Sequence, residues 1–316
     1  MSKIALYGRA EAKLNLDLRI TGIDDKNYHL LSSTALFIDL YDSVALTLYP
    51  ADQAQLCPAI DLKLTGDFAQ YLHPESLHDN LAVRAIGLFH QLFPQFSRFT
   101  YALALTKDIP IGAGLAGGTS DAITCLYMLA AHHHVLDQVR DHSLIALGAD
   151  APLLWHGKLQ AQPILISGMG DRLTKADQPL PLFDSIHLVI AFTNEAVSTK
   201  GCFDHYDQLV MDGKIEFSPL NIPLFDSLFK QQAWDAASLA GVLAQSHNDL
   251  QIPAIGLQPE IGHLLNEMRQ DSQCHFAQMT GSGAACFGLF SSKQAAHNHQ
   301  AHLHSKSYWA TTARIL

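Results

Sequence analysis

The sequence has few cysteines, a small charged fraction and no long apolar run, and each scarcity excludes a class of protein. Its five cysteines are scattered and never form a CxxC pair, which favours buried reduced thiols over disulfides or structural zinc. No apolar run reaches about 18 residues, so we expect no membrane-spanning helix. The start, MSKIALYGRAEAKLN, lacks the apolar core of a secretory signal, and we expect a cytoplasmic protein.

Charge and length narrow the class further. Charged residues make up 16% of the chain, and 20 lysines and arginines stand against 30 aspartates and glutamates, a formal net charge of −10. Nucleic acids and anionic membranes bind basic surfaces, so this balance argues against both, although a local pocket for a small anion remains possible. The 316 residues, 48% of them hydrophobic, exceed what one core usually serves and predict two lobes, 1–165 and 166–316.

Apolar periodicity predicts a mixture of strands and helices. Alternating apolar residues indicate strands, and apolar residues every three or four positions indicate helices. We expect strands at 4–20, 30–40, 43–49, 99–106, 186–192 and 287–290, and helices at 80–93, 120–131, 233–243 and 262–268. The segment 201–225 contains Pro219 and Pro223 and is expected to be irregular.

A glycine-rich loop joins the predicted strand 99–106 to the predicted helix 120–131. It reads KDIPIGAGLAGGTSD over residues 107–121 and places four glycines between positions 112 and 118. A helix N-terminus carries unpaired N–H groups and partial positive charge, and glycines let these donors close around phosphate oxygens. The alternative is that the glycines serve tight packing of the helix on the strand. No Gly-Lys-Ser/Thr follows, and the loop lies late for a dinucleotide fingerprint.

The loop sequence PIGAGLAGGTSD resembles the phosphate loop of the GHMP kinases, which include galactose, homoserine, mevalonate and phosphomevalonate kinases. Seven further segments resemble, in order, the branch of that family that phosphorylates 4-diphosphocytidyl-2-C-methyl-D-erythritol. They are AEAKLNLDLRITG, KNYHLLSSTALFIDLYD, DNLAVRA, ALGADAPLLWHG, EAVSTKGCF, HNDLQIPAIGLQPEI and MTGSGAACFGLF. This ordered set is far more specific than a glycine loop alone.

The resemblance implies an α+β, two-lobed GHMP kinase fold with the active site in the cleft between the lobes, the ATP-binding domain being 1–165 and the C-terminal domain 166–316. It implies transfer of a phosphoryl group from ATP to the 2-hydroxyl of 4-diphosphocytidyl-2-C-methyl-D-erythritol, giving the 2-phosphate and ADP, in the non-mevalonate isoprenoid pathway. The partner is then a small molecule with a cytidine diphosphate group, and the chain acts as a monomer or a homodimer.

Two ionisable residues are candidates for catalysis. From the sequence alone, Asp150 in GADAP reads as a turn residue or helix cap, and Lys13 reads as a solvated strand residue. The resemblance places the catalytic aspartate and lysine of the family at these two positions. A carboxylate can take a hydroxyl proton if a nearby cation keeps it ionised. Whether Asp150 removes the proton or only orients the alcohol stays open, because the transition state of phosphoryl transfer is loose.

Residues near both ends of the chain are candidates for the substrate site. The resemblance assigns cytidine binding to Tyr28 and His29, which follow a predicted turn, although Tyr28 is alternatively a core aromatic residue. Asn15 lies two residues from Lys13, hence on the same strand face, where it can hydrogen-bond the substrate diol. The segment Val197, Ser198 and Thr199 is expected to line the same site.

The ATP site is expected around the glycine loop. The candidates are Asn80, Lys107, Pro110, Gly112, Gly114, Leu115, Gly117, Gly118, Thr119 and Ser120. Lys107 is alternatively a surface lysine. Phosphoryl transfer implies Mg²⁺. Ser120 is its candidate ligand, because no cluster of carboxylates in the sequence indicates a different ligand. The GSG turn at 281–283 either abuts the active site or serves packing between the lobes.

The sequence departs from the family pattern in the loop. Ala116 stands where the family usually has glycine, and we expect it to avoid positive φ. Thr119 stands where serine is usual, and residues 200–245 match weakly. Histidines at 132–134 and within 297–304 raise the hypothesis of a metal site, but no cysteine or carboxylate lies at zinc spacing from them. The segment 297–304 is instead expected to form a solvated polar helix near the C-terminus.

Two alternatives to the implied activity remain. One is another GHMP kinase of the homoserine or mevalonate type, against which the Tyr28–His29 pair and the NDL and PEI segments count. The other is a relative that binds nucleotide without catalysis, against which the presence of Lys13, Asp150 and Ser120 counts.

Overall fold

The computed structural model describes residues 3–52, 58–72, 79–160, 162–176, 181–219 and 224–316. The chain divides into two compact units, and each of them gathers segments that are distant in sequence. Unit 1 comprises Met1–Ala12, Leu40–Ile111 and Ala116–Gln160, and unit 2 comprises Lys13–Asp39, Gly112–Leu115 and Ala161–Leu316. The predicted domain boundary at residue 165 stays a prediction.

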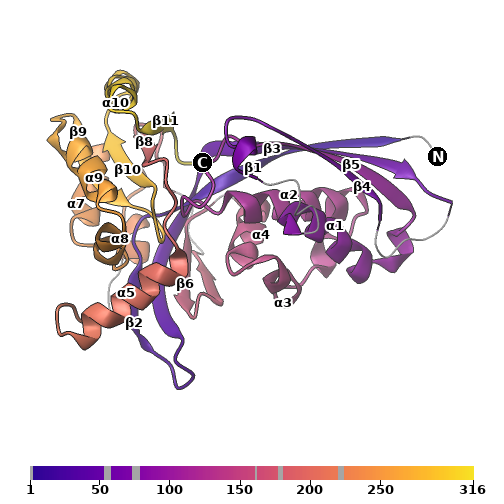
Figure 1. The fold of residues 1–316 in the computed structure, drawn as a ribbon, viewed down its shortest axis with the longest axis horizontal. Coiled ribbons are helices and arrows are strands. Elements are labelled where there is room, and N and C mark those ends of the chain that lie inside the picture. Colours follow the sequence, from indigo (N-terminus) through magenta and orange to yellow (C-terminus); the bar gives the residue numbers. More distant parts are fainter. Residues whose placement is uncertain (1–2, 53–57, 73–78, 161, 177–180, 220–223) are drawn as a thin grey trace. The chain divides into compact units, whose positions relative to one another are not determined.

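Unit 1 is a sheet with helices on one face (Figure 1). Its strands are β1 (Ile4–Asn15) up to Ala12, the second half of β3 (His29–Pro50), β4 (Ile60–Thr65) and β5 (Phe99–Thr106). Strand β3 pairs antiparallel with β5 from Ser43↔Thr106 to Pro50↔Phe99, and β4 pairs parallel with β5. The helices are α1 (Leu81–Leu92), α2 (Gly117–His132), α3 (Asp141–Leu144) and α4 (Ala151–Leu159).

The alternation of side chains along β5 fixes which face of the unit 1 sheet is covered. In FTYALALT, the residues Phe99, Tyr101, Leu103 and Leu105 are buried, and the residues between them are half-buried. Successive strand residues point to opposite faces, so one face of β5 belongs to the core. Helices α1 and α2 pack against each other in this unit, and α2 also packs against α4.

Unit 2 holds the first half of β3 and a second sheet. Strand β3 pairs antiparallel with β2 (Arg19–Ile23) and β6 (Ile164–Gly168), and β6 pairs with β7 (Arg172–Lys175). The second sheet has the order β11 (Trp309–Ala313), β8 (His187–Phe192), β10 (Cys286–Phe290) and β9 (Cys274–Met279). Its helices are α5 (Thr199–Met211), α6 (Leu224–Leu228), α7 (Ala236–Leu243), α8 (Gln251–Leu257), α9 (Glu260–Gln270) and α10 (Lys293–Ser305).

The expected α+β architecture is confirmed, and so are the strand at 99–106 and the helices at 80–93 and 120–131. The two strands expected at 30–40 and 43–49 form one continuous strand, β3. The expectation of an irregular segment at 201–225 is wrong, because α5 occupies Thr199–Met211. That helix buries only Cys202 and Tyr206, so its apolar pattern is too sparse to read from sequence. Residues 220–223 of that segment, Pro223 included, lie outside the described residues.

The structure also bears on what the sequence predicted for the cysteines, the histidines and membrane-spanning segments. The four cysteines in the described part of the chain are free, and Cys57 lies outside it. Helix α10 carries the C-terminal histidines, but His299 is buried against Phe290 and within 2.8 Å of Asp271, so this helix is not solvated all round. Among the described residues, no three metal-binding side chains gather, and no helix is long and apolar enough to cross a bilayer.

The expectation that Ala116 avoids positive φ is wrong. Ala116 has φ 57° and ψ 28°, the left-handed conformation, immediately before α2. The β-carbon of an L-residue crowds the following carbonyl there, which costs about 1–2 kcal/mol.

We therefore expect Ala116→Gly to raise the free energy of unfolding by up to about 1 kcal/mol, because relief of this crowding exceeds the added freedom of the unfolded chain. Ala116→Val should lower it by more than about 1 kcal/mol, since a β-branched side chain tolerates positive φ poorly. Urea unfolding of the three proteins measures both changes. A glycine variant less stable than the valine variant would contradict the left-handed assignment.

Candidate active site

The predicted site residues divide between the two units, and each group is described in its own unit. Unit 1 contains Asn80, Lys107, Pro110, Gly117, Gly118, Thr119, Ser120 and Asp150. Unit 2 contains Lys13, Asn15, Tyr28, His29, Gly112, Gly114, Leu115, Val197, Ser198 and Thr199. The predicted position of the site in a cleft between two lobes stays a prediction.

In unit 1, the first turn of α2 presents backbone N–H groups that no side chain caps. Ala116, the residue before the helix, has no side-chain capping group, and the first turn begins with Gly117 and Gly118. A β-carbon at Gly117 would lie 3.0 Å from Ile109 Cγ2, so this glycine serves packing, as the alternative interpretation holds. A β-carbon at Gly118 would meet no described atom within 4 Å apart from its chain neighbours and the backbone of its own helix, so packing against other elements does not explain the second glycine.

The turn that holds Asp150 lies beside the start of α2 in the same unit. A β-carbon at Gly148 would lie 3.3 Å from Thr119 Oγ1, which brings this hydroxyl close to the turn. Asp150 is half-buried and directly precedes α4, and its side chain does not cap that helix. Unit 1 therefore gathers Thr119 and the Asp150 turn, although they are distant in sequence.

A buried group of three charged side chains anchors this part of unit 1. The ammonium of Lys107 forms ion pairs with Asp42 on β3 and with Asp121 in the first turn of α2. Asp42 Oδ1 also accepts the N–H groups of Asp108 at 2.6 Å and Ile109 at 2.8 Å. These contacts tie β3 and the end of β5 to the helix start. The alternative that Lys107 is a surface lysine is wrong, because only 3% of it is exposed.

Burial perturbs the carboxyl of Asp121. Removal from water raises the pKa of Asp121 to about 7, the negative charge of Asp42 adds to the rise, and the ammonium of Lys107 opposes it. Its Oδ1 is buried and has no hydrogen-bond partner within the described chain. The predicted nucleotide contact of Lys107 stays a prediction, and its ammonium already holds two carboxylates.

The remaining candidates of unit 1 have clear structural contacts. Asn80 caps α1, since its Oδ1 accepts the N–H groups of Ala82 at 2.9 Å and Val83 at 3.3 Å. The Ser120 hydroxyl donates to the carbonyl oxygen of Glu11 at 2.7 Å. These contacts do not form a set of metal ligands. Among the described residues, no group of three histidine, cysteine, aspartate or glutamate side chains lies around Ser120.

In unit 2, Lys13 and Asn15 lie on one face of β1, as predicted. The Lys13 ammonium donates to Asn15 Oδ1. The backbone N–H of Asn15 donates to Thr280 Oγ1 at 2.8 Å, and the Thr280 hydroxyl donates back to the Asn15 carbonyl at 3.2 Å. Lys13 is 6% and Asn15 is 3% exposed, so the pair is held inside the protein rather than in solvent.

The GSG turn at 281–283 lies against this pair and against the glycine loop. A β-carbon at Gly281 would lie 3.3 Å from Lys13 Nζ and 2.9 Å from the carbonyl oxygen of Gly114. Gly114 itself has φ 79°, and its β-carbon would lie 2.9 Å from the carbonyl oxygen of Gly283. The two turns approach backbone to backbone, which only glycine permits. Unit 2 thus brings the Gly112–Leu115 part of the loop to Lys13.

Of the predicted cytidine residues, His29 contacts α5. His29 Nε2 lies 2.7 Å from Asp207 Oδ1, and its ring centroid lies 4.7 Å from that of Phe203. Tyr28 is 59% exposed, so the alternative that it is a core aromatic residue is wrong. Ser198 caps α5 by accepting the N–H of Gly201 at 3.1 Å. The hydroxyl of Thr199 lies 2.8 Å from that of Ser282, the middle residue of the GSG turn.

Several contacts of the site were not predicted from the sequence. Asp42, Thr280 and Asp207 each hold a predicted site residue, and each comes from a distant part of the chain. For Asp207 the sequence did contain a local pattern: it follows Phe203 by four residues, so the two side chains share one helix face. The partners of Lys107 and Asn15 had none, since long-range pairing does not appear in local periodicity.

Comparison with known proteins follows this geometry. Residues 80–161 match the family model of the GHMP kinases N terminal domain, and residues 230–308 match that of the GHMP kinases C terminal. A 4-diphosphocytidyl-2-C-methyl-D-erythritol kinase from Ruegeria pomeroyi is 34% identical over 289 residues, covering 92% of this chain and 90% of that protein. The chain belongs to the GHMP kinase family. A kinase of the same name from Cereibacter sphaeroides is 33% identical and covers 97% of this chain.

Solved structures agree with this family membership. A crystal structure of 4-(cytidine 5'-diphospho)-2C-methyl-D-erythritol kinase has a TM-score of 0.71 and 26% identity, covering 98% of this chain and 99% of that chain. Homoserine kinase from Cytophaga hutchinsonii has a TM-score of 0.64 at 15% identity and shares the fold. The chain is thus an ATP-dependent small-molecule kinase of the GHMP family.

We expect Lys107→Met to lower the free energy of unfolding by about 3–5 kcal/mol, because it leaves two carboxylates buried without a cation. Lys200→Met is the matched control, since Lys200 pairs with Asp204 on the exposed surface of α5 and should contribute little. Urea unfolding of both variants measures the difference. Equal losses in the two variants would show that the buried group does not stabilise unit 1.

Proposed function

We propose that this kinase transfers the γ-phosphoryl group of ATP to the 2-hydroxyl of 4-diphosphocytidyl-2-C-methyl-D-erythritol, giving the 2-phosphate and ADP. The observation that carries the proposal is the similarity to kinases of that name over 92% and 97% of the chain. The reaction belongs to the non-mevalonate isoprenoid pathway, for which a cytoplasmic location is proposed. The domain boundary at residue 165 and a monomeric or homodimeric state belong to the same proposal.

The triphosphate of ATP is assigned to the glycine loop and the first turn of α2. Uncapped N–H groups and the positive end of the helix attract phosphate oxygens. Open space at Gly118 supports this assignment, because an added β-carbon there would contact no described atom beyond its chain neighbours and the backbone of its own helix. Pro110, Gly112, Gly114 and Leu115 form the loop before it, and Asn80 and Lys107 complete the proposed ATP residues.

Mg²⁺ is treated as part of the MgATP substrate. Mg²⁺ retains several waters and binds through one or two protein oxygens plus phosphates. Ser120 is the proposed protein contact. Its hydroxyl proton is already donated to Glu11, which leaves the oxygen lone pairs for the ion.

The chemical step is assigned to Lys13 and Asp150. Phosphoryl transfer needs little covalent help from the protein, so positioning and charge neutralisation dominate. The Lys13 ammonium, held by Asn15, neutralises developing charge and orients the acceptor hydroxyl. Asp150 accepts the hydroxyl proton or fixes its direction. The proposal assigns one catalytic group to each unit.

The cytidine diphosphate part of the acceptor is assigned to unit 2. Tyr28 presents an exposed ring for stacking on a pyrimidine, and His29 presents an imidazole that Asp207 holds in place. Asn15 is assigned to the diol of the methylerythritol. Val197, Ser198 and Thr199 are proposed to line the same site at the start of α5.

We expect Asp150→Asn and Lys13→Met each to lower kcat by about 100-fold or more, because each removes a group that acts on the transferred proton or phosphoryl charge. ADP release is measured with MgATP and 4-diphosphocytidyl-2-C-methyl-D-erythritol, mevalonate, homoserine or no acceptor. The surface substitutions Asp137→Asn and Lys230→Met are the matched controls and should retain full activity.

Each outcome of this assay has a distinct meaning. Turnover only with the cytidine-containing acceptor supports the proposed substrate. Turnover with mevalonate or homoserine instead would keep the family and refute the substrate. Full activity in the Asp150→Asn variant would refute its catalytic assignment.

We expect Gly118→Ala to raise KM for ATP about 10-fold or more, while KM for the acceptor stays within about 2-fold, because the added methyl group occupies phosphate space. Alanine is the better helix former, so the free energy of unfolding should rise by about 0.5–1 kcal/mol. The opposite changes in affinity and stability separate a binding role from a folding role. An unchanged KM for ATP would place the triphosphate elsewhere.

A further inference from the structure

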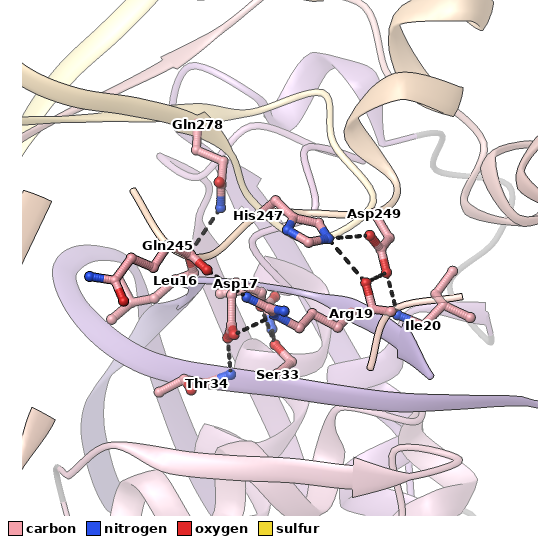
Figure 2. A network of polar contacts seen from close by, with 12 residues as sticks. Leu16, Asp17, Arg19, Ile20, Ser33, Thr34, Gln245, His247, Asp249 and Gln278 are labelled. Atoms are coloured by element: carbon pink, nitrogen blue, oxygen red, sulfur yellow. Dashed lines mark hydrogen bonds and ion pairs between the residues drawn. The ribbon is translucent and has the colours of Figure 1, made fainter. Parts of the chain in front are cut away.

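A chain of hydrogen bonds runs from the backbone of unit 2 to the Lys13 ammonium. The Ser33 hydroxyl on β3 donates to the carbonyl oxygen of Asp17 at 2.5 Å. Asn15 Nδ2 donates to Ser33 Oγ at 2.7 Å, and Asn15 Oδ1 accepts from Lys13 Nζ. Figure 2 shows Ser33 beside the segment that carries Asp17. Every member of the chain lies in the same unit.

The direction of each bond in this chain is fixed by the number of protons available. A serine hydroxyl has one proton, and a carbonyl oxygen can only accept. Because the Ser33 proton is used on the Asp17 carbonyl, Ser33 Oγ can only accept from its other neighbour. The Asn15 amide must therefore turn its NH₂ group to Ser33 and its oxygen to Lys13.

The reversed amide is excluded on both sides. It would place the NH₂ group of Asn15 against the Lys13 ammonium, two donors facing each other. It would also place Oδ1 against Ser33 Oγ, where no proton remains. Asn15 and Ser33 are only 3% and 2% exposed, so bulk water cannot supply hydrogen bonds to the groups that the reversed amide would leave without partners.

The backbone around the chain is held independently of it. Thr280 exchanges two hydrogen bonds with the backbone of Asn15. Asp17 Oδ1 accepts the N–H of Thr34 at 2.6 Å, which fastens the Asp17 segment to β3, and the Asp17 carboxylate lies 3.7 Å from the Arg19 guanidinium (Figure 2). Because the main chain is fixed on both sides, the role left to Ser33 is to fix the orientation of the Asn15 side-chain amide.

We propose that Ser33 is a positioning residue of the kinase reaction, which fixes the Asn15 amide so that its oxygen holds the Lys13 ammonium in place for the acceptor hydroxyl. The inference rests on the proposed function of Lys13. Ser33 acts through Asn15 and contacts neither ATP nor the acceptor. Its loss should therefore lower kcat and leave KM for ATP unchanged.

Steady-state kinetics of Ser33→Ala tests the proposal. We expect kcat to fall about 10- to 100-fold with KM for ATP within about 2-fold, because a small misplacement of a catalytic group has effects of this size. Ser33→Thr keeps the hydroxyl and should restore most of the rate. Ser33→Cys keeps the volume with a weak acceptor and should resemble Ser33→Ala. Ser32→Ala, the neighbour on the other face of β3, is the matched control and should be unaffected.

A double-mutant cycle separates positioning from general stability. If Ser33 acts only through Asn15, then Ser33→Ala should cost almost nothing in an Asn15→Ala background. Additive losses in kcat would overturn the proposal, and so would wild-type kinetics of Ser33→Ala. Thermal unfolding of each variant shows which are folded, and Ser33→Cys replaces Ser33→Ala if the latter is not.

A readout independent of activity keeps this test separate from that of the proposed substrate. The side-chain NH₂ protons of Asn15, assigned by their absence in Asn15→Ala, should exchange slowly with water in the wild-type protein. They should exchange at least about 10-fold faster in Ser33→Ala, since the buried acceptor is lost. Equal exchange rates would overturn the proposal even if no acceptor is turned over.

Discussion

A buried ammonium group requires acceptors within hydrogen-bond reach, and both units of this kinase are arranged around that constraint. In unit 1 the acceptors are two carboxylates from β3 and α2, which bind Lys107 where the glycine loop begins. In unit 2 the acceptor of Lys13 includes a neutral amide. The difference is chemical as well as structural. Carboxylates neutralise the charge of a cation that they bind, whereas an amide orients the cation without adding a negative charge.

In the glycine loop, glycine is needed at different positions for different physical reasons. Gly114 adopts positive φ and permits backbone contact with the GSG turn. Gly117 permits contact with Ile109, and only Gly118 faces open space. The packing hypothesis therefore accounts for Gly114 and Gly117, and phosphate binding stays a prediction for Gly118. Ala116 adds a third case, in which a residue with a β-carbon accepts a conformation suited to glycine.

Much of the site was predictable because its signals are local. The strand–loop–helix order at 99–131 and the shared face of Lys13 and Asn15 follow from periodicity over a few residues. Helix α5 was missed because its few buried side chains leave almost no pattern. The partners Asp42, Ser33 and Thr280 were missed because pairing between distant strands and turns depends on the whole fold. Local sequence thus indicates the candidate groups, and tertiary contacts determine how they are held.

The path of β3 has a consequence for synthesis of the protein. Its first half belongs to a unit that is completed only near the end of the chain, where Ile38 pairs with Ile315 and the N–H of Asp39 donates to the Arg314 carbonyl at 3.0 Å. At about 5–20 residues per second, the ribosome needs tens of seconds to deliver those partners. During that interval the residues of unit 2 that have already been synthesised emerge without their final neighbours. The nascent chain therefore exposes unpaired backbone N–H and C=O groups at this part of β3 until residues 314 and 315 have been made.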